Sequence, residues 1–217
     1  DNSIKSVLII GTGKFGKSLA LKMAELGNEV MVVDKEENEL RDISDYVTSA
    51  QVADCMDESV LKALGINNFD ICFVCIGDNF QSSLEITSLL KDNGAKHVVS
   101  KADRDIHAKF LLRNGADEVI FPEKDMAIRA AYRFSAHHMF DYIQLSQDYS
   151  ICEIDTPENW IGKTISQVNV RSRYNINILA YKEYGKIYPL SDPNYVFKEN
   201  THLVVSGAWK DVEKLNK

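Results

Sequence analysis

The sequence predicts an α/β protein in which a doubly wound parallel sheet is followed by a second, smaller α+β domain. Two observations carry this prediction. Short, wholly apolar runs alternate with amphipathic segments up to about residue 122, and after about residue 148 the pattern changes to half-buried strands. Runs that are apolar throughout indicate strands covered on both faces, and strict alternation with helices implies a parallel sheet.

Each element of the first domain has its own signal. An apolar stripe through Phe15 and Met23 predicts a helix that closes at Gly27, and Asp57 can cap a helix that Gly65 stops. Three further helices are expected, one marked by Leu40 and Ile43, one by Leu84, Leu89 and Leu90, and one by Phe110 and Leu111 that ends at Gly115. The expected strands are residues 6–10, 30–33, 47–52, 71–76, 97–100 and 118–121.

The same patterns divide the chain into residues 1–122, residues 123–147 and residues 148–217. The middle segment is expected to be a crossover helix and hinge, with Asp125 as its cap and an amphipathic face that continues toward Phe140. The last segment, with expected strands at 149–154, 176–181 and 201–205, is near the lower size limit for independent folding. We therefore expect it to dimerise.

Composition narrows the classes of function. The 217 residues include 45% apolar and 26% charged side chains, as in ordinary soluble proteins. The net charge of −7 argues against a nucleic-acid partner, because proteins that bind nucleic acid unaided usually carry a basic face. No apolar run approaches the roughly 20 residues that span a bilayer, and the first residues lack the pattern of a signal peptide. We expect a cytoplasmic protein that reaches a membrane only through a partner.

Two cysteines have the CxxC spacing of some zinc and redox sites. Cys72 and Cys75 lie within an apolar run with strand character. Residues three apart on a strand point to opposite faces, so the two sulfur atoms diverge. We therefore expect both to pack in the core as small apolar side chains.

The strongest chemical signal is a glycine-rich turn between the first strand and the first helix. Its sequence matches GxGxxG, the phosphate-binding turn of Rossmann-like domains. The first glycine permits the tight turn, the second lets a phosphate approach the backbone, and the third allows close contact between helix and strand. The turn consists of Gly11-Thr12-Gly13-Lys14-Phe15-Gly16.

Asp34 stands at the end of the second expected strand, where a carboxylate can accept hydrogen bonds from ribose hydroxyls. Its negative charge disfavours a 2′-phosphate, so the site suits adenosine nucleotides or NAD and not NADP. Lys14 could reach a β- or γ-phosphate, or it could be an ordinary exposed lysine.

The chain resembles the RCK proteins, which regulate potassium conductance, and is most similar to the cytosolic gating-ring subunits of Ktr/Trk potassium uptake systems. The resemblance covers nearly the whole chain, and the order and spacing of its motifs make it specific. The motifs that carry the resemblance are the glycine-rich turn, Asp34 and residues 76–81, 122–126, 162–165, 169–171 and 177–180.

The resemblance implies a regulatory subunit and not an enzyme. Homodimers would assemble into a ring, commonly an octamer, on the inner face of the membrane beneath a potassium channel or transporter subunit. ATP and ADP would compete for the Rossmann cleft, and their exchange would gate that partner. The cleft residues carried over by motif are Lys14, Asp34, Lys35, Asp54, Cys55, Ile76, Gly77, Lys101, Asp103, His107 and Glu123.

The resemblance also implies two further ligands. Glu123 would lie near the phosphates and could hold Mg²⁺ or Ca²⁺. The C-terminal module would bind cyclic di-AMP at a dimer interface, with Arg171 on phosphate because its planar fork pairs phosphate oxygens. The other residues of this second site would be Asn169, Asn177, Ile178 and Pro189.

One departure from the family leaves the nucleotide open. Where the family turn often has arginine, this chain has Lys14, which lacks the bidentate grip of a guanidinium. NAD(H) therefore remains an alternative to ATP and ADP, and an NAD-dependent oxidoreductase remains the alternative function. Such an enzyme needs a positioned acid or base, and the one histidine of the last domain, His202, lies in mid-strand without a clear carboxylate partner.

Overall fold

The computed structural model describes residues 4–77, 79–136 and 138–216. It confirms the predicted fold class, with a parallel sheet between helices and a separate antiparallel sheet. The chain divides into two compact units, of which the first ends at Lys124 and the second begins at Asp125, within helix α6 (Pro122–Ser135). Within the described ranges, no helix has the length and apolar character needed to cross a bilayer.

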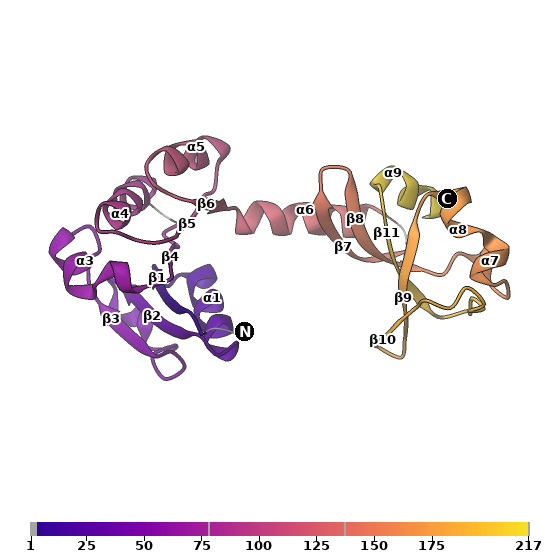
Figure 1. Cartoon of the computed structure of the whole chain (residues 1–217), viewed down its shortest axis with the longest axis horizontal. Coiled ribbons are helices and arrows are strands. Elements are labelled where there is room, and N and C mark those ends of the chain that lie inside the picture. Colours follow the sequence, from indigo (N-terminus) through magenta and orange to yellow (C-terminus); the bar gives the residue numbers. More distant parts are fainter. Residues whose placement is uncertain (1–3, 78, 137, 217) are drawn as a thin grey trace. The chain divides into compact units, whose positions relative to one another are not determined.

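Six parallel strands form the sheet of the first unit, in the order β3-β2-β1-β4-β5-β6 (Figure 1). The chain winds outward from β1 through β2 to β3 and then returns to the other side of β1 as β4. Strand order therefore reverses between β1 and β4. The strands are β1 (Ser6–Ile10), β2 (Glu29–Asp34), β3 (Ser49–Val52), β4 (Ile71–Val74), β5 (Val98–Lys101) and β6 (Glu118–Ile120).

Helices cover both faces of this sheet because its strands are apolar on both faces. Leu8 and Ile9 of β1 point to opposite sides and are both fully buried. Ile9 packs in a cluster with Ala20 of α1, whereas Leu8 packs with Leu61 of α3 and Leu90 of α4. The helices are α1 (Lys14–Glu25), α2 (Glu37–Leu40), α3 (Glu58–Leu64), α4 (Phe80–Asp92) and α5 (Asp105–Arg113), with a 3₁₀ turn η1 (Ile66–Asn68).

Local predictions in this unit are confirmed at several points. Asp57 caps α3 by accepting a hydrogen bond from the backbone N–H of Ser59 at 2.9 Å, and Gly65 ends the helix with a φ of 67°. Cys72 and Cys75 are buried in two different apolar clusters, as their opposite directions on a strand require.

The turn between β1 and α1 is packed so closely that it requires glycine. A β-carbon on Gly16 would overlap the carbonyl oxygen of Gly11. Gly11 has a φ of 91°, and a β-carbon there would lie 3.0 Å from the carbonyl group of Cys75. Gly13, by contrast, has an ordinary φ of −62° and open space where a side chain would point. Gly11 and Gly16 therefore serve the packing of α1, and Gly13 leaves the turn accessible.

The helix after the first sheet differs from the prediction at both ends. Its cap was expected at Asp125 and its end toward Phe140, but α6 begins at Pro122 and ends at Ser135. Proline suits the first turn of a helix because it has no N–H group to leave unpaired. The residues after α6 form strand β7 (Met139–Ser146), whose pairing with the next strand outweighs the helical periodicity.

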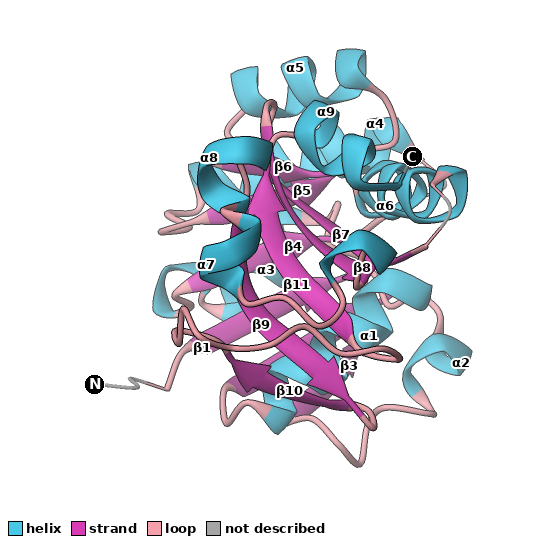
Figure 2. Cartoon of the chain, turned by 90° about the vertical axis from the view of Figure 1, so that its right-hand side faces the viewer, coloured by secondary structure: helices cyan, strands magenta, loops and turns pink. Residues whose placement is uncertain are grey.

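The second unit contains a five-stranded antiparallel sheet in the order β10-β9-β11-β8-β7 (Figure 2). Its core surrounds Trp160 and Phe197, each 1% exposed, with ring centroids 5.1 Å apart. The further strands are β8 (Tyr149–Asp155), β9 (Asn177–Glu183), β10 (Lys186–Pro189) and β11 (His202–Gly207). The helices are η2 (Glu158–Trp160), α7 (Ile165–Val168), α8 (Val170–Tyr174), α9 (Trp209–Val212) and η3 (Glu213–Asn216).

Strand β10 was not predicted, because only its pairing makes it a strand. It follows β9 after a two-residue turn in which Tyr184 and Gly185 have φ of 50° and 77°. Positive φ at both central residues is typical of the tight hairpin turn whose twist matches that of the flanking strands. All four residues of β10 are exposed, so the sequence carries no burial pattern there.

The packing of the glycine turn gives a first prediction. Gly16→Ala should lower the free energy of unfolding of the first unit by about 3 kcal/mol, because the new methyl group meets a backbone oxygen that cannot move away. Gly13→Ala is the matched control and should change the free energy of unfolding by less than about 1 kcal/mol. Urea unfolding of both variants makes the comparison, and equal effects would contradict the assigned roles.

Candidate nucleotide-binding site

The predicted cleft residues gather at the carboxyl ends of the parallel strands. β1 leads into the glycine turn, β2 ends at Asp34, and β5 ends at Lys101. Because the strands are parallel, these ends share one edge of the sheet, and the reversal of strand order between β1 and β4 falls there. Doubly wound proteins bind their ligands in the crevice at such a reversal.

The glycine turn presents backbone N–H groups at the start of α1. Gly13 is the N-cap residue, no side chain caps it, and the first turn contains no acidic residue. The first N–H groups of a helix have no partner within the helix, and they give this end a partial positive charge. An exposed turn of this kind attracts phosphate groups.

Asp34 is joined to the glycine turn by hydrogen bonds. Its Oδ2 accepts one from the backbone N–H of Thr12 at 2.8 Å and another from the Thr12 hydroxyl at 2.9 Å. Its Oδ1 accepts one from the backbone N–H of Glu36 at 2.9 Å. The carboxylate predicted to hold a ribose and the turn predicted to hold phosphates therefore form one connected unit.

A pocket of 320 Å³ lies at the carboxyl ends of β4 and β5. Within it, Nζ of Lys101 lies 2.8 Å from Oε1 of Glu123 and 3.7 Å from Oδ1 of Asp103. The structure thus brings together four of the predicted cleft residues. The pocket is lined by Gly77, Lys101, Ala102, Asp103, Glu123 and Lys124.

Lys101 and Glu123 favour each other's charged form. Burial lowers the pKa of Lys101, but the hydrogen bond to Glu123 and the nearby carboxylates raise it further, so that it lies above its ordinary value. The same hydrogen bond holds the pKa of Glu123 below its usual range. The pocket therefore contains an ammonium group paired with a carboxylate at neutral pH.

The divalent cation predicted at Glu123 stays a prediction. Its carboxylate is paired with Lys101. Among the residues that the structure describes, no group of three or more His, Cys, Asp or Glu side chains could hold a metal ion. Mg²⁺ is usually bound through one or two carboxylates together with phosphate oxygens and water, so Glu123 alone could supply only part of such a site.

Four more of the predicted cleft residues are described by their exposure or by their distance from the glycine turn. Lys14, Lys35 and Asp54 are exposed, and Oδ1 of Asp54 accepts a hydrogen bond from the backbone N–H of Met56 at 2.9 Å. The side chain of Ile76 lies 3.2 Å from the position that a β-carbon of Gly11 would take.

Three predicted residues face the protein and not the open turn. Phe15 packs against the apolar cluster that contains α1. Cys55 is buried, and burial raises the pKa of its thiol to about 12, so it is neutral and weakly reactive at pH 7. The ring of His107 stacks on that of Phe80, with centroids 3.9 Å apart.

The predicted second site is spread over α8 and the strands that follow it. Asn169, Arg171, Asn177 and Pro189 are exposed. Ile178 packs against the core of the second unit, and neighbouring residues on a strand point to opposite faces. The structure therefore places Ile178 behind the sheet surface that Asn177 occupies.

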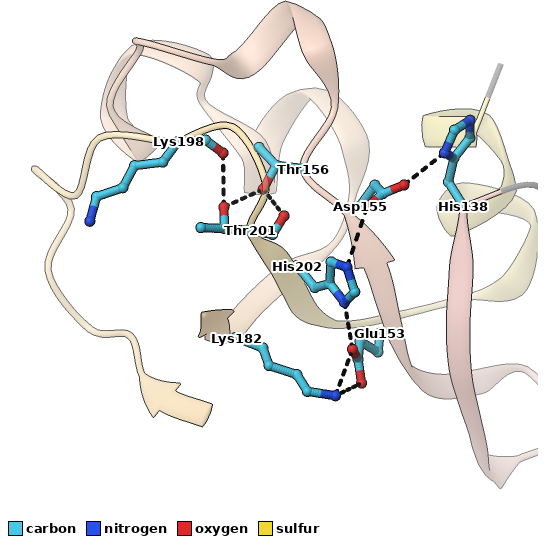
Figure 3. A network of polar contacts seen from close by, with 8 residues as sticks. All are labelled: His138, Glu153, Asp155, Thr156, Lys182, Lys198, Thr201 and His202. Atoms are coloured by element: carbon cyan, nitrogen blue, oxygen red, sulfur yellow. Dashed lines mark hydrogen bonds and ion pairs between the residues drawn. The ribbon is translucent and has the colours of Figure 1, made fainter. Parts of the chain in front are cut away.

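A chain of polar contacts crosses the sheet of the second unit (Figure 3). Glu153 on β8 accepts hydrogen bonds from Nζ of Lys182 at 2.9 and 3.0 Å, and its Oε1 lies 2.7 Å from Nδ1 of His202. Asp155 stands between His202 and His138, at 3.5 Å from Nε2 of the former and 2.7 Å from Nδ1 of the latter. The sequence had left His202 without a carboxylate partner, and the structure gives it two.

Comparison with known proteins identifies the family. The TrkA-N domain family matches residues 7–122, and the TrkA-C domain family matches residues 151–217. The Ktr system potassium uptake protein C of Bacillus subtilis is 35% identical over 213 residues, which are 98% of this chain and 96% of the relative. The chain belongs to the Ktr/TrkA family of potassium uptake proteins. The Ktr system potassium uptake protein A of the same organism is 37% identical over 210 residues, 97% of this chain and 95% of the relative.

Solved structures agree with the RCK resemblance. The RCK domain of GsuK is 18% identical and has a TM-score of 0.67, over 100% of this chain and 48% of that chain. The GsuK channel bound to NAD is 18% identical with a TM-score of 0.66, over 97% of this chain and 38% of that chain. At this identity the likeness shows the fold alone.

Some residues of the candidate site were not predicted from the sequence. No role was predicted for Thr12, which the structure joins to Asp34 through its hydroxyl and its backbone N–H. Ala102 directly follows β5 and Lys124 lies in the first turn of α6, and no motif marks either residue as part of the pocket. The pairing of Glu153 with Lys182 depends on strand register, which alternation along each strand does not reveal.

The polar chain of the second unit gives a pH prediction. Burial raises the pKa of Glu153, but hydrogen bonds from His202 and Lys182 outweigh it, so the pKa lies below its usual range. A carboxyl group whose pKa is lowered by folding stabilises the protein above its unfolded pKa and loses this effect as the pH falls. Glu153→Gln should therefore lower the free energy of unfolding by about 1 to 3 kcal/mol at pH 7 and by much less at pH 3.

The exposed Glu199, changed to Gln, is the matched control and should have little effect at either pH. Urea unfolding at the two pH values gives the comparison. A loss from Glu153→Gln that is the same at pH 7 and pH 3 would show that the ion pairs of Glu153 are not its cause.

Proposed function

We propose that the chain is the regulatory subunit of a potassium uptake system and binds an adenine nucleotide in its first unit. The main observation behind this proposal is that Asp34 is hydrogen-bonded to Thr12 of the glycine turn. Free N–H groups at the start of α1 suit a diphosphate, and the adjacent carboxylate suits a ribose. Membership of the Ktr/TrkA family indicates that the system concerned is one of potassium uptake.

ADP and ATP are the proposed ligands, and NAD(H) is the alternative. All three share the adenosine diphosphate part that the turn and Asp34 would hold. Lys14 is exposed at the start of α1, where its charge could reach a third phosphate, but it does not offer the paired donors of an arginine. GsuK was solved with NAD, and the likeness to GsuK is one of fold alone.

The proposed role is regulation and not catalysis. Hydride transfer needs an acid or base positioned beside the nicotinamide. The ring of His107 is stacked on Phe80, and the thiol of Cys55 is held neutral by burial. Lys101 and Glu123 neutralise each other across 2.8 Å. An oxidoreductase remains the second candidate because it would use the same glycine turn and Asp34.

The proposed partner is a membrane-embedded potassium channel or transporter subunit, bound on the cytoplasmic side by a ring of homodimers. Relatives named as potassium uptake proteins support this partner. Apolar side chains that a dimer could cover are exposed on β9 and β10. Leu179 is 42% exposed, Ile187 59% and Tyr188 40%.

Cyclic di-AMP is the proposed ligand of the second unit. Arg171 on α8 and Asn177 at the start of β9 are both exposed, so a phosphate and an adenine could reach them. Pro189 ends the neighbouring strand β10, which pairs with β9. A ligand with two phosphates and two-fold symmetry suits a site completed by a second copy of the chain.

Ligand-induced stabilisation tests the first site. ADP and ATP should each raise the melting temperature, because a ligand at one hundred times its Kd stabilises the native state by about 2.7 kcal/mol. Gly13→Ala should abolish most of this rise, since its methyl group occupies the approach to the backbone N–H groups. A sustained change in nicotinamide absorbance with NADH and small carbonyl substrates would instead support the oxidoreductase.

Two arginines on α8 test the second site. Arg171→Ala should abolish calorimetric binding of cyclic di-AMP and leave ADP binding unchanged, because the two sites lie in different units. Arg173→Ala is the matched control, since Arg173 is equally exposed but lies over the ring of Tyr174 at 5.8 Å. Equal loss in both variants would point to general electrostatic attraction, and no loss in either would remove the assignment.

A further inference from the structure

The carboxylate of Asp34 has little capacity left for a ligand. Oδ2 accepts two hydrogen bonds from Thr12, at 2.8 Å from the backbone N–H and 2.9 Å from the hydroxyl. Oδ1 accepts one from the backbone N–H of Glu36 at 2.9 Å. A carboxylate offers about four acceptor positions, two on each oxygen. Three are occupied, and the one that remains is on Oδ1.

The arrangement around Oδ2 is fixed from several sides. Thr12 is fully buried, so water does not compete for its hydroxyl. Its neighbour Gly11 donates its N–H to the carbonyl oxygen of Val33 at 2.9 Å, and Ala53 donates to that of Asp34 at 2.9 Å. The backbones on both sides of the Thr12–Asp34 contact are thus held by the sheet, and they keep Oδ2 beside the Thr12 hydroxyl.

We propose that Thr12 determines how Asp34 recognises a ribose: by occupying Oδ2, it leaves the carboxylate able to accept a hydrogen bond from one ribose hydroxyl only. This inference rests on the proposed nucleotide site and goes beyond it. A strand-end carboxylate with both oxygens free can hold the 2′- and 3′-hydroxyls together. Here the nucleotide is selected through a single hydroxyl, and Thr12 is the specificity-determining residue.

The wild-type protein tests this directly. Calorimetric titration with ADP, 2′-deoxy-ADP and 3′-deoxy-ADP gives three dissociation constants. A hydrogen bond to a charged acceptor contributes strongly to binding, so one deoxy analogue should bind about tenfold or more weakly than ADP. The other should bind within about threefold of ADP. Comparable losses for both analogues would overturn the inference, because they would show that both hydroxyls are held.

Variants of Thr12 test whether this residue is the cause. Thr12→Ala removes the hydroxyl and leaves space beside Oδ2, so the analogue that wild type tolerates should become clearly weaker than ADP, by about fivefold or more. Thr12→Ser keeps the hydroxyl and should retain the wild-type pattern. If Thr12→Ala binds ADP with the wild-type pattern, Thr12 does not set the selectivity and the inference is overturned.

The failure of this inference differs from failure of the proposed function. If wild type binds no ADP at millimolar concentration, the nucleotide site itself is wrong. If it binds ADP but responds equally to both deoxy analogues, the site stands and the role of Thr12 falls. Should Thr12→Ala fail to fold, Thr12→Val removes the hydroxyl at nearly the same volume and makes the same comparison.

Discussion

The contact between Gly16 and the carbonyl of Gly11 is the constraint on which the first unit depends. It lets α1 start directly against the sheet, and a side chain at either position would displace the helix or the backbone of Cys75. Because α1 starts there, its free N–H groups face the edge where strand order reverses. The same close turn brings Thr12 within hydrogen-bonding distance of Asp34. One steric requirement thus fixes both the start of α1 and the contact of Thr12 with Asp34.

Several charged side chains at the carboxyl edge of the parallel sheet already have partners within the chain. Glu123 holds the ammonium group of Lys101, and Thr12 with the N–H of Glu36 saturates most of Asp34. An incoming nucleotide would therefore find two unoccupied places, the free N–H groups at the start of α1 and one acceptor position on Oδ1 of Asp34, beside groups that are already paired. Glu123 is the second residue of α6, the helix in which the first unit ends and the second begins. A ligand that competes for Lys101 would act on the first turn of that helix.

The sequence predicted the sheet, the glycine turn and Asp34 because each depends on local pattern: apolar runs, glycine spacing and a strand end. Prediction from the sequence failed where the secondary structure depends on pairing between segments that are distant along the chain. Residues 139–146 were placed in the end of the crossover helix and in the hinge after it, because their pairing with β8 is not visible in the sequence, and β10 has no burial pattern of its own. The partners of Glu123 and Asp34 depend on how strand ends meet, so the sequence did not reveal the pairing of Glu123 with Lys101.

The central claim is that the glycine turn and Asp34 together hold the diphosphate and ribose of an adenine nucleotide. A crystal structure grown with millimolar ADP tests it most directly. The account predicts density for the diphosphate at the N–H groups of residues 13–16 and for a ribose hydroxyl at Oδ1 of Asp34, with the Thr12 contacts to Oδ2 intact. An empty turn, or ADP bound elsewhere on the chain, would contradict it.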